Sequence, residues 1–208
     1  MKHFLQFAVG LSLLVSLPVL ALGDAEAGQR KAAVCAACHG VDGNSVVPNW
    51  PKIAGQHSAY LERQVGLIKS GSRPVPEMAG IVINLSDQDM ADLAAYYSGQ
   101  ARTAGLTDEA LLASGELLYR AGNSETDIPA CMSCHGPAVE GNPLSGYPAL
   151  AGQHSVYSEK MLKGFRTGQT WGDDDASSKI MTAVTKRLTD DEIKAVSSYI
   201  QGLYAVEE

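Results

Sequence analysis

The chain has 208 residues, of which 45% are hydrophobic and 19% charged, a composition typical of a globular protein rather than a disordered one. Its formal net charge of −7 argues against nucleic acid as a partner. Aromatic residues make up only 6%, so two small domains built from this chain would have thin cores. A large buried cofactor would fill that deficit.

The chain opens with the features of an export signal. Lys2 precedes an almost wholly apolar stretch, Leu5 to Leu22, and small residues occupy positions 21 and 23, where signal peptidase reads the chain. We therefore expect residues 1–23 to be a signal peptide that is cleaved before Asp24. An uncleaved membrane anchor is the alternative, because the apolar stretch is nearly long enough to span a bilayer.

The rest of the chain is an internal repeat. Three pairs of segments match in the same order: Cys35–Gly40 with Cys131–Gly136, Pro51–Ser58 with Pro148–Ser155, and Leu85–Asp87 with Leu188–Asp190. The run from Ser98 to Thr107 lacks periodicity and reads as a linker. We expect an N-terminal domain over residues 24–103 and a C-terminal domain over residues 104–208.

Each half is predicted to be helical, with no stretch that alternates like a strand. The expected helices are Ala25–Ala36, Ser58–Gly71 and one after Ser86, then Asp108–Ala121, Ser155–Gly168 and one after Thr189. Ser86 and Thr189 are each followed three residues later by an acid, which is the spacing of a capping box. Gly99 and Gly202 are expected to end their helices with a positive φ. The predicted fold class is all-α, with two tandem domains.

The chemistry lies in two Cys-x-x-Cys-His elements. Cysteines three apart can each form a thioether with one haem, and the adjacent histidine then points at the iron. The cofactor-binding residues predicted in this way are Cys35 and Cys38 with His39, and Cys131 and Cys134 with His135. Two copies at the same place in a duplicated domain predict two covalently bound haem c groups, and they use all four cysteines of the chain.

Three other interpretations compete for these cysteines. A structural disulfide leaves the histidine after each pair unexplained. A thioredoxin-like dithiol needs a strand–helix context, which the pattern lacks. A zinc site needs the two pairs to come together, and they lie 96 residues apart.

Each iron needs a sixth ligand, and one methionine per half lies in register. Met78 and Met181 each precede the last helix, seven residues before Leu85 and Leu188, in what reads as an irregular loop. A thioether favours ferrous iron and raises the reduction potential. His57 and His154 also repeat and are the alternative ligands, although a histidine at the start of a helix more often makes a local hydrogen bond.

The chain resembles the dihaem cytochromes c4 over nearly all of its length beyond the signal. The resemblance rests on Cys-Ala-Ala-Cys-His-Gly, Trp-Pro-Lys-Ile-Ala-Gly-Gln and Ala-Cys-Met-Ser-Cys-His-Gly-Pro. It implies two class I cytochrome c domains, each with a His/Met haem, in a periplasmic electron carrier. The partners implied are respiratory redox proteins, namely a donor and a terminal oxidase or other acceptor, with loose association with the inner membrane. It also implies that the carbonyls of Pro51 and Pro148 accept the Nδ1 protons of His39 and His135.

An enzyme, such as a dihaem peroxidase or a thiosulfate-oxidising protein, would need an open iron position. A methionine for both irons argues against one, so we expect an electron carrier and not an enzyme. Charge is uneven between the halves, with seven basic and eight acidic residues in 24–103 against eight and fifteen in 104–208. Asp173, Asp174 and Asp175 are expected to form a solvated loop or, alternatively, a docking patch for a basic partner.

Overall fold

A computed structural model describes residues 23–203, so the predicted signal peptide lies almost entirely outside the described residues. The helices of the N-terminal domain are α1 (Ala25–Lys31), α2 (Ala33–His39), α3 (Ser58–Lys69), α4 (Pro76–Val82) and α5 (Asp87–Ser98). Those of the C-terminal domain are α6 (Glu109–Ala121), α7 (Met132–His135), α8 (Ser155–Arg166), α9 (Ala176–Thr185) and α10 (Asp190–Gly202). Between residues 23 and 203 there is no strand, only two isolated β-bridges, which confirms the all-α prediction.

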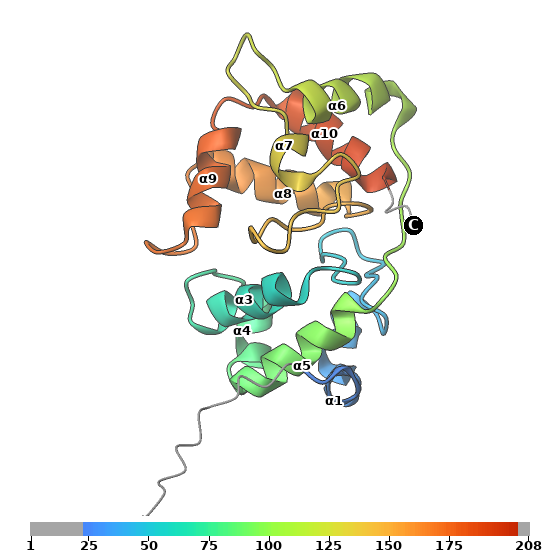
Figure 1. Cartoon of the computed structure of the whole chain (residues 1–208), viewed down its shortest axis with the longest axis vertical. Helices are drawn as coiled ribbons and strands as arrows, with labels where there is room; N and C mark the ends of the chain where they lie inside the picture. The colour runs from blue at the N-terminus through green and yellow to red at the C-terminus, as the bar shows by residue number, and fades with distance from the viewer. Residues whose placement is uncertain (1–22, 204–208) are drawn as a thin grey trace, which may run out of the picture.

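The two domains repeat one architecture. The first and last helices pack together in each, α1 on α5 and α6 on α10, and the middle helices α3 and α8 pack on those last helices. The short helices α4 and α9 then lie against α3 and α8. Figure 1 shows the two halves as separate bodies, joined by the run between α5 and α6.

Two helix boundaries differ from the expectation. The first predicted helix breaks at Ala32, where the backbone tightens so that its N–H bonds to the carbonyl of Gln29, and α2 follows as a separate helix. Gly99 does not end α5 with a positive φ, since its φ is −81°. Gly202 does not end α10 with a positive φ either: it lies inside the helix, and Leu203 is the C-cap. A glycine is needed here because a Cβ would lie 1.8 Å from Thr107 Oγ1 in the linker.

The crossing of the first and last helices depends on a glycine in each domain. A Cβ on Gly28 of α1 would lie 2.0 Å from the carbonyl oxygen of Asp92, and one on Gly115 of α6 would lie 2.3 Å from that of Ala195. These contacts are shorter than any real Cβ contact, so the helix backbones approach as closely as they do only because a side chain is missing.

The hydrophobic core of each domain is small, as the composition predicted. In the N-terminal domain it consists of Ala32, Leu93, Tyr96 and Tyr97. The C-terminal domain has a larger cluster, centred on Tyr119 and Ile193 at the crossing of α6 with α10. Both clusters include cysteine side chains at their margin, Cys35 in one and Cys131 in the other. A haem bound at those cysteines would therefore extend an existing apolar core.

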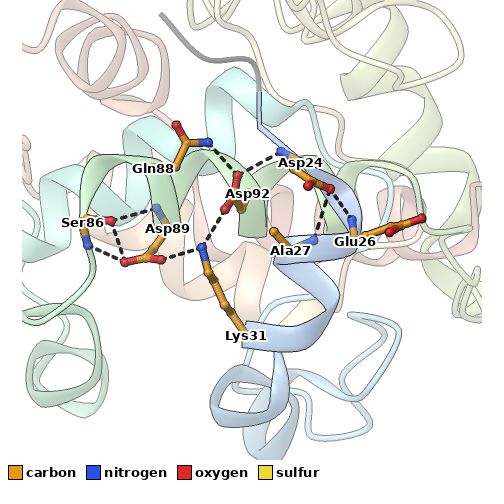
Figure 2. A network of polar contacts seen from close by, with 8 residues as sticks. All are labelled: Asp24, Glu26, Ala27, Lys31, Ser86, Gln88, Asp89 and Asp92. Atoms are coloured by element: carbon orange, nitrogen blue, oxygen red, sulfur yellow. Dashed lines mark hydrogen bonds and ion pairs between the residues drawn. The ribbon is translucent and has the colours of Figure 1, made fainter.

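A polar network fastens α1 to the start of α5 (Figure 2). Lys31 donates to Asp92 and pairs with Asp89, both at 2.6 Å. The backbone N–H of Asp24 also donates to Asp92, at 2.9 Å. Asp89 closes the predicted capping box with Ser86, and Glu192 closes the equivalent box with Thr189. Both predicted capping boxes are confirmed.

Replacing Gly115 by Ala should destabilise the protein, although Gly to Ala within a helix usually stabilises. Within a helix, Gly to Ala normally stabilises by roughly 0.5–1 kcal/mol, but here the new Cβ meets the carbonyl of Ala195 and the Cβ of Tyr199. We expect the free energy of unfolding to fall by about 1–3 kcal/mol, measured by denaturant titration. Ser114→Ala, at the exposed neighbouring position, is the control and should change stability little. A stabilised Gly115→Ala protein would show that the helices can move apart without cost.

Replacing Lys31 by Met should lower stability at pH 7 and leave it unchanged in strong acid. The ammonium of Lys31 is the main cause that lowers the pKa of Asp92 to about 2, and it lowers the pKa of Asp89 as well. A carboxyl group with a depressed pKa in the folded state stabilises the fold above its ordinary pKa, near 4, and this stabilisation is lost as pH falls through about 2. The difference in unfolding free energy between the two proteins should therefore shrink over that interval.

Arg30→Met removes an exposed positive charge from the same helix and is the control for net charge. Its effect should be small at every pH. A deficit in Lys31→Met that stayed constant between pH 7 and pH 2 would mean that the lysine acts through its apolar stem rather than through the carboxylates.

Candidate haem centres

The two thiols of each Cys-x-x-Cys-His element lie on one helical turn. Cys35 and Cys38 are part of α2, and His39 is its last residue. Cys131 immediately precedes the four-residue helix α7, which contains Cys134 and ends at His135. All four cysteines are free thiols. Burial raises the pKa of the Cys35 thiol, and it raises that of Cys131 to about 11, so these side chains are held as neutral thiols against the core.

Each histidine is buried and oriented by a backbone carbonyl. His39, 7% exposed, donates from Nδ1 to the carbonyl of Pro51 at 2.9 Å. His135, 6% exposed, donates in the same way to Pro148 at 3.0 Å. Because a carbonyl can only accept, Nδ1 must carry the proton, and the lone pair of Nε2 is left for a metal. Burial lowers the pKa of both rings, which favours the neutral form. The role that the resemblance implied for Pro51 and Pro148 is confirmed.

These residues fit a covalently held haem. Each domain supplies two free thiols one helical turn apart, next to an imidazole whose tautomer is that of a metal ligand. The zinc alternative finds no comparable set, because residues 23–203 contain no group of three or more His, Cys, Asp or Glu side chains that could hold a metal ion.

The two methionines lie on short helices rather than in irregular loops. Met78 is in α4, which starts at Pro76, a residue suited to the first turn. Met181 is in α9, which is capped by the side chain of Asp175. The loop interpretation was wrong because both segments are only 7 and 10 residues long, shorter than the windows over which a helical pattern is recognised. Their role as iron ligands remains a prediction.

The two repeated histidines outside the motifs each face the backbone of the other domain. His154 Nε2 lies 2.7 Å from the carbonyl of Ser45, in the other domain, so its contact is between domains and not local as expected. The ring of His57 is partly buried, and burial lowers its pKa. His154 thus uses Nε2, the nitrogen that an iron ligand would offer, to hold the domains together.

The acidic run of the C-terminal domain is only partly exposed. Asp173 and Asp174 are exposed, as a solvated loop would be. Asp175, by contrast, is buried, caps α9 and forms an ion pair with Arg63 of the other domain. A docking patch could therefore use two of the three carboxylates at most.

The residues that join the domains were not predicted from the sequence. Beside the Arg63 pair, Arg73 donates to the hydroxyl of Tyr157 at 2.8 Å and lies 4.6 Å from the ring of Trp171. Gln56 and Gln153 also cross the boundary. The glutamines carried a usable signal, because they repeat in register just as Met78 and Met181 do.

Comparison with known proteins agrees with this architecture. The family model described as cytochrome c matches residues 25–99 and 113–204. Cytochrome c4 of Pseudomonas aeruginosa is 49% identical over 198 residues, covering 93% of this chain and 98% of that protein. The crystal structure of reduced recombinant cytochrome c4 from Pseudomonas stutzeri superposes with a TM-score of 0.83 at 49% identity, covering 88% of this chain and all of that one.

A more distant relative carries a different name. A thiosulfate dehydrogenase electron acceptor of Thiomonas intermedia is 34% identical over 178 residues, covering 84% of this chain and 80% of that protein. These relatives and the two matched segments point to the same kind of protein as the repeated thiol and imidazole sets do. The chain belongs to the cytochrome c family and, within it, to the dihaem cytochromes c4, electron carriers with one covalently bound haem c in each of two domains.

Proposed function

We propose that this protein works in the periplasm and passes electrons to a terminal oxidase or another respiratory acceptor. His39 and Met78 hold one iron and His135 and Met181 the other, while the two cysteine pairs form the thioethers. The observation that carries the proposal is the duplicated histidine whose Nδ1 proton is fixed by a proline carbonyl. It gives both domains the same kind of metal ligand, as a carrier with two similar redox centres requires.

The residues around each haem set how readily it gives up its electron; the haem itself supplies the one-electron chemistry. The carbonyl that accepts from the histidine makes the imidazole a better donor, which favours ferric iron. A methionine thioether favours ferrous iron and raises the reduction potential. With a methionine on both irons, neither haem offers an exchangeable position, and this supports a carrier rather than an enzyme.

Several observations support the proposed location and domain limits. An export signal over residues 1–23 and homologues named cytochrome c4 support a periplasmic protein. No helix within residues 23–203 is long and apolar enough to cross a membrane. The boundary between domains 24–103 and 104–208 is supported by the break in the family match between residues 99 and 113.

A second candidate partner comes from the relatives. Two proteins at 34% identity, from Thiomonas intermedia and Stutzerimonas stutzeri, are named thiosulfate dehydrogenase electron acceptor. A thiosulfate dehydrogenase is therefore a specific donor to test, and it is compatible with an oxidase as acceptor.

Replacing Met78 or Met181 by Ala should free the sixth coordination position of one haem iron in each variant, without detaching the haem. The thioethers remain, but the affected iron loses its sixth ligand, so that it turns high-spin, binds carbon monoxide and loses most of its high potential. Optical spectra and a redox titration measure these changes. Met90→Leu, in the buried face of α5, is the matched control and should keep the wild-type spectrum. If Met78→Ala also keeps it, Met78 is a core residue and His57 becomes the candidate ligand.

The carrier function is tested with the purified dihaem protein. Reduced protein mixed with bacterial membranes that contain a terminal oxidase should be reoxidised in air, and the oxidation should stop when the oxidase is inhibited. In a parallel assay, thiosulfate and a purified thiosulfate dehydrogenase should reduce the ferric protein if the second candidate holds. Failure of the reoxidation with every oxidase tested would contradict the proposed acceptor.

A further inference from the structure

Two buried glutamines cross the domain boundary in a reciprocal arrangement. Gln153 Oε1 accepts the backbone N–H of Lys52 at 2.9 Å, and its Nε2 donates to the carbonyl of Lys52 at 2.9 Å. Gln56 makes the same pair of bonds with Ala149. Its Oε1 accepts the backbone N–H of Ala149 at 3.0 Å, and its Nε2 donates to the carbonyl of Ala149 at 2.8 Å. Each side-chain amide thus pairs with one residue of the other domain through both of its polar ends.

The orientation of each amide is fixed from its own side as well. Gln56 Oε1 also accepts the N–H of His57, and Gln153 Oε1 that of His154, both at 3.0 Å. Two N–H donors therefore point at each Oε1, and a carbonyl faces each Nε2. The two side chains are only 5% and 6% exposed, so water does not compete with these bonds.

The residues that the glutamines hold are the ones after the two prolines. The N–H of Lys52 and the C=O of Pro51 belong to a single planar peptide group, and that C=O accepts from His39. The N–H of Ala149 shares a peptide group with the C=O of Pro148, which accepts from His135. Each histidine is therefore linked to a glutamine of the other domain through one peptide group.

Hydrogen bonds in such a series strengthen one another. An N–H that donates pushes electron density toward the oxygen of its own peptide group, which strengthens the next bond by about 10–30%. A more negative carbonyl draws the Nδ1 proton more strongly and makes the imidazole a stronger donor to the iron. A stronger donor stabilises ferric iron and lowers the reduction potential.

We propose that Gln153 and Gln56 are positioning residues that act across the domain boundary, each on the histidine of the other domain's haem. Gln153 lowers the potential of the haem held by His39, and Gln56 lowers that of the haem held by His135. The docking of the two domains then becomes part of the ligand environment of both irons. This inference rests on the proposed function only in taking His39 and His135 as the iron ligands.

The test is a crossed pair of variants, Gln153→Met and Gln56→Met, in the full-length dihaem protein. Methionine keeps the length of the side chain but accepts no strong hydrogen bond. The midpoint potential of each haem is followed by NMR of haem methyl resonances assigned to their domains. Gln153→Met should raise the potential of the N-terminal haem more than that of the C-terminal haem, and Gln56→Met should do the reverse.

A purely structural role predicts a different pattern. Loosening of the interface would admit water to both haem edges, favour ferric iron and lower both potentials in both variants. That result, or equal shifts of both haems, would overturn the inference. Tyr157→Phe, which removes a domain contact that involves neither proline peptide, measures the effect of loosening alone and should not show the crossed pattern.

A second pair of variants guards against misfolding of the first. Gln153→Glu and Gln56→Glu keep an oxygen facing the backbone N–H, and the neutral acid also keeps a donor, its O–H, facing the carbonyl. The potential of the haem in the other domain should therefore stay the same, or fall if the acid ionises. A rise there would overturn the inference. The ring-proton resonances of the axial histidines distinguish a failure of the proposed ligands from a failure of the glutamine role. If these resonances do not belong to His39 and His135, the proposed ligands are wrong. If they do, but the potentials show no crossed shifts, only the role of the glutamines is wrong.

Discussion

The bond from a histidine Nδ1 to a proline carbonyl is the constraint around which each domain is organised. The segment that follows each proline is fixed by backbone hydrogen bonds at two places, which holds that carbonyl in position. Ile53 and Ala54 donate to the carbonyl of Gly43, just beyond the histidine helix, and Gly55 donates to Tyr97 at the end of α5. In the C-terminal domain Leu150 and Ala151 donate to Val139, and Gly152 to Ile200 of α10. The loop therefore spans from the ligand to the last helix in both domains.

The first and last helices also hold the turn that follows each histidine, through tyrosine hydroxyls. Tyr119 of α6 donates to the carbonyl of Gly136, directly after His135, at 2.6 Å. In the N-terminal domain the hydroxyl that reaches the equivalent turn comes instead from α5, where Tyr96 donates to Val41 at 3.0 Å. At Gly28 the helices lie so close that a Cβ there would be 2.8 Å from the Cβ of Tyr96. Because the apolar clusters are small, such polar ties carry a larger share of the order around each haem than they would in a domain with a thick core.

Sequence reasoning succeeded where a feature is local or repeats in register. The capping boxes at Ser86 and Thr189, the long helices and the paired thiols depend on residues a few positions apart, and all were predicted. It failed where tertiary contacts determine the backbone conformation. Gly99 adopts an ordinary helical φ, while Val139, a β-branched residue, is held at a φ of 64° where the other domain has Gly43 at 81°. A fully buried site over-determines that conformation, and no local pattern announces it. The contact of His154 with the other domain was not predicted either, because a residue that repeats in register does not reveal which atoms it meets.

The two glutamine contacts have the form of an isologous interface, in which one surface patch binds a copy of itself. Gln56 holds Ala149 and Gln153 holds Lys52, and these are equivalent positions of the repeat. Such an interface needs only one patch to be specified by evolution. A single-domain ancestor that carried it could pair with a second copy through the same four bonds, and gene duplication would then make the dimer permanent. In the present chain the linker raises the effective concentration of each patch at the other. Because all four bonds go to backbone atoms, residues as different as Lys52 and Ala149 can occupy the equivalent positions.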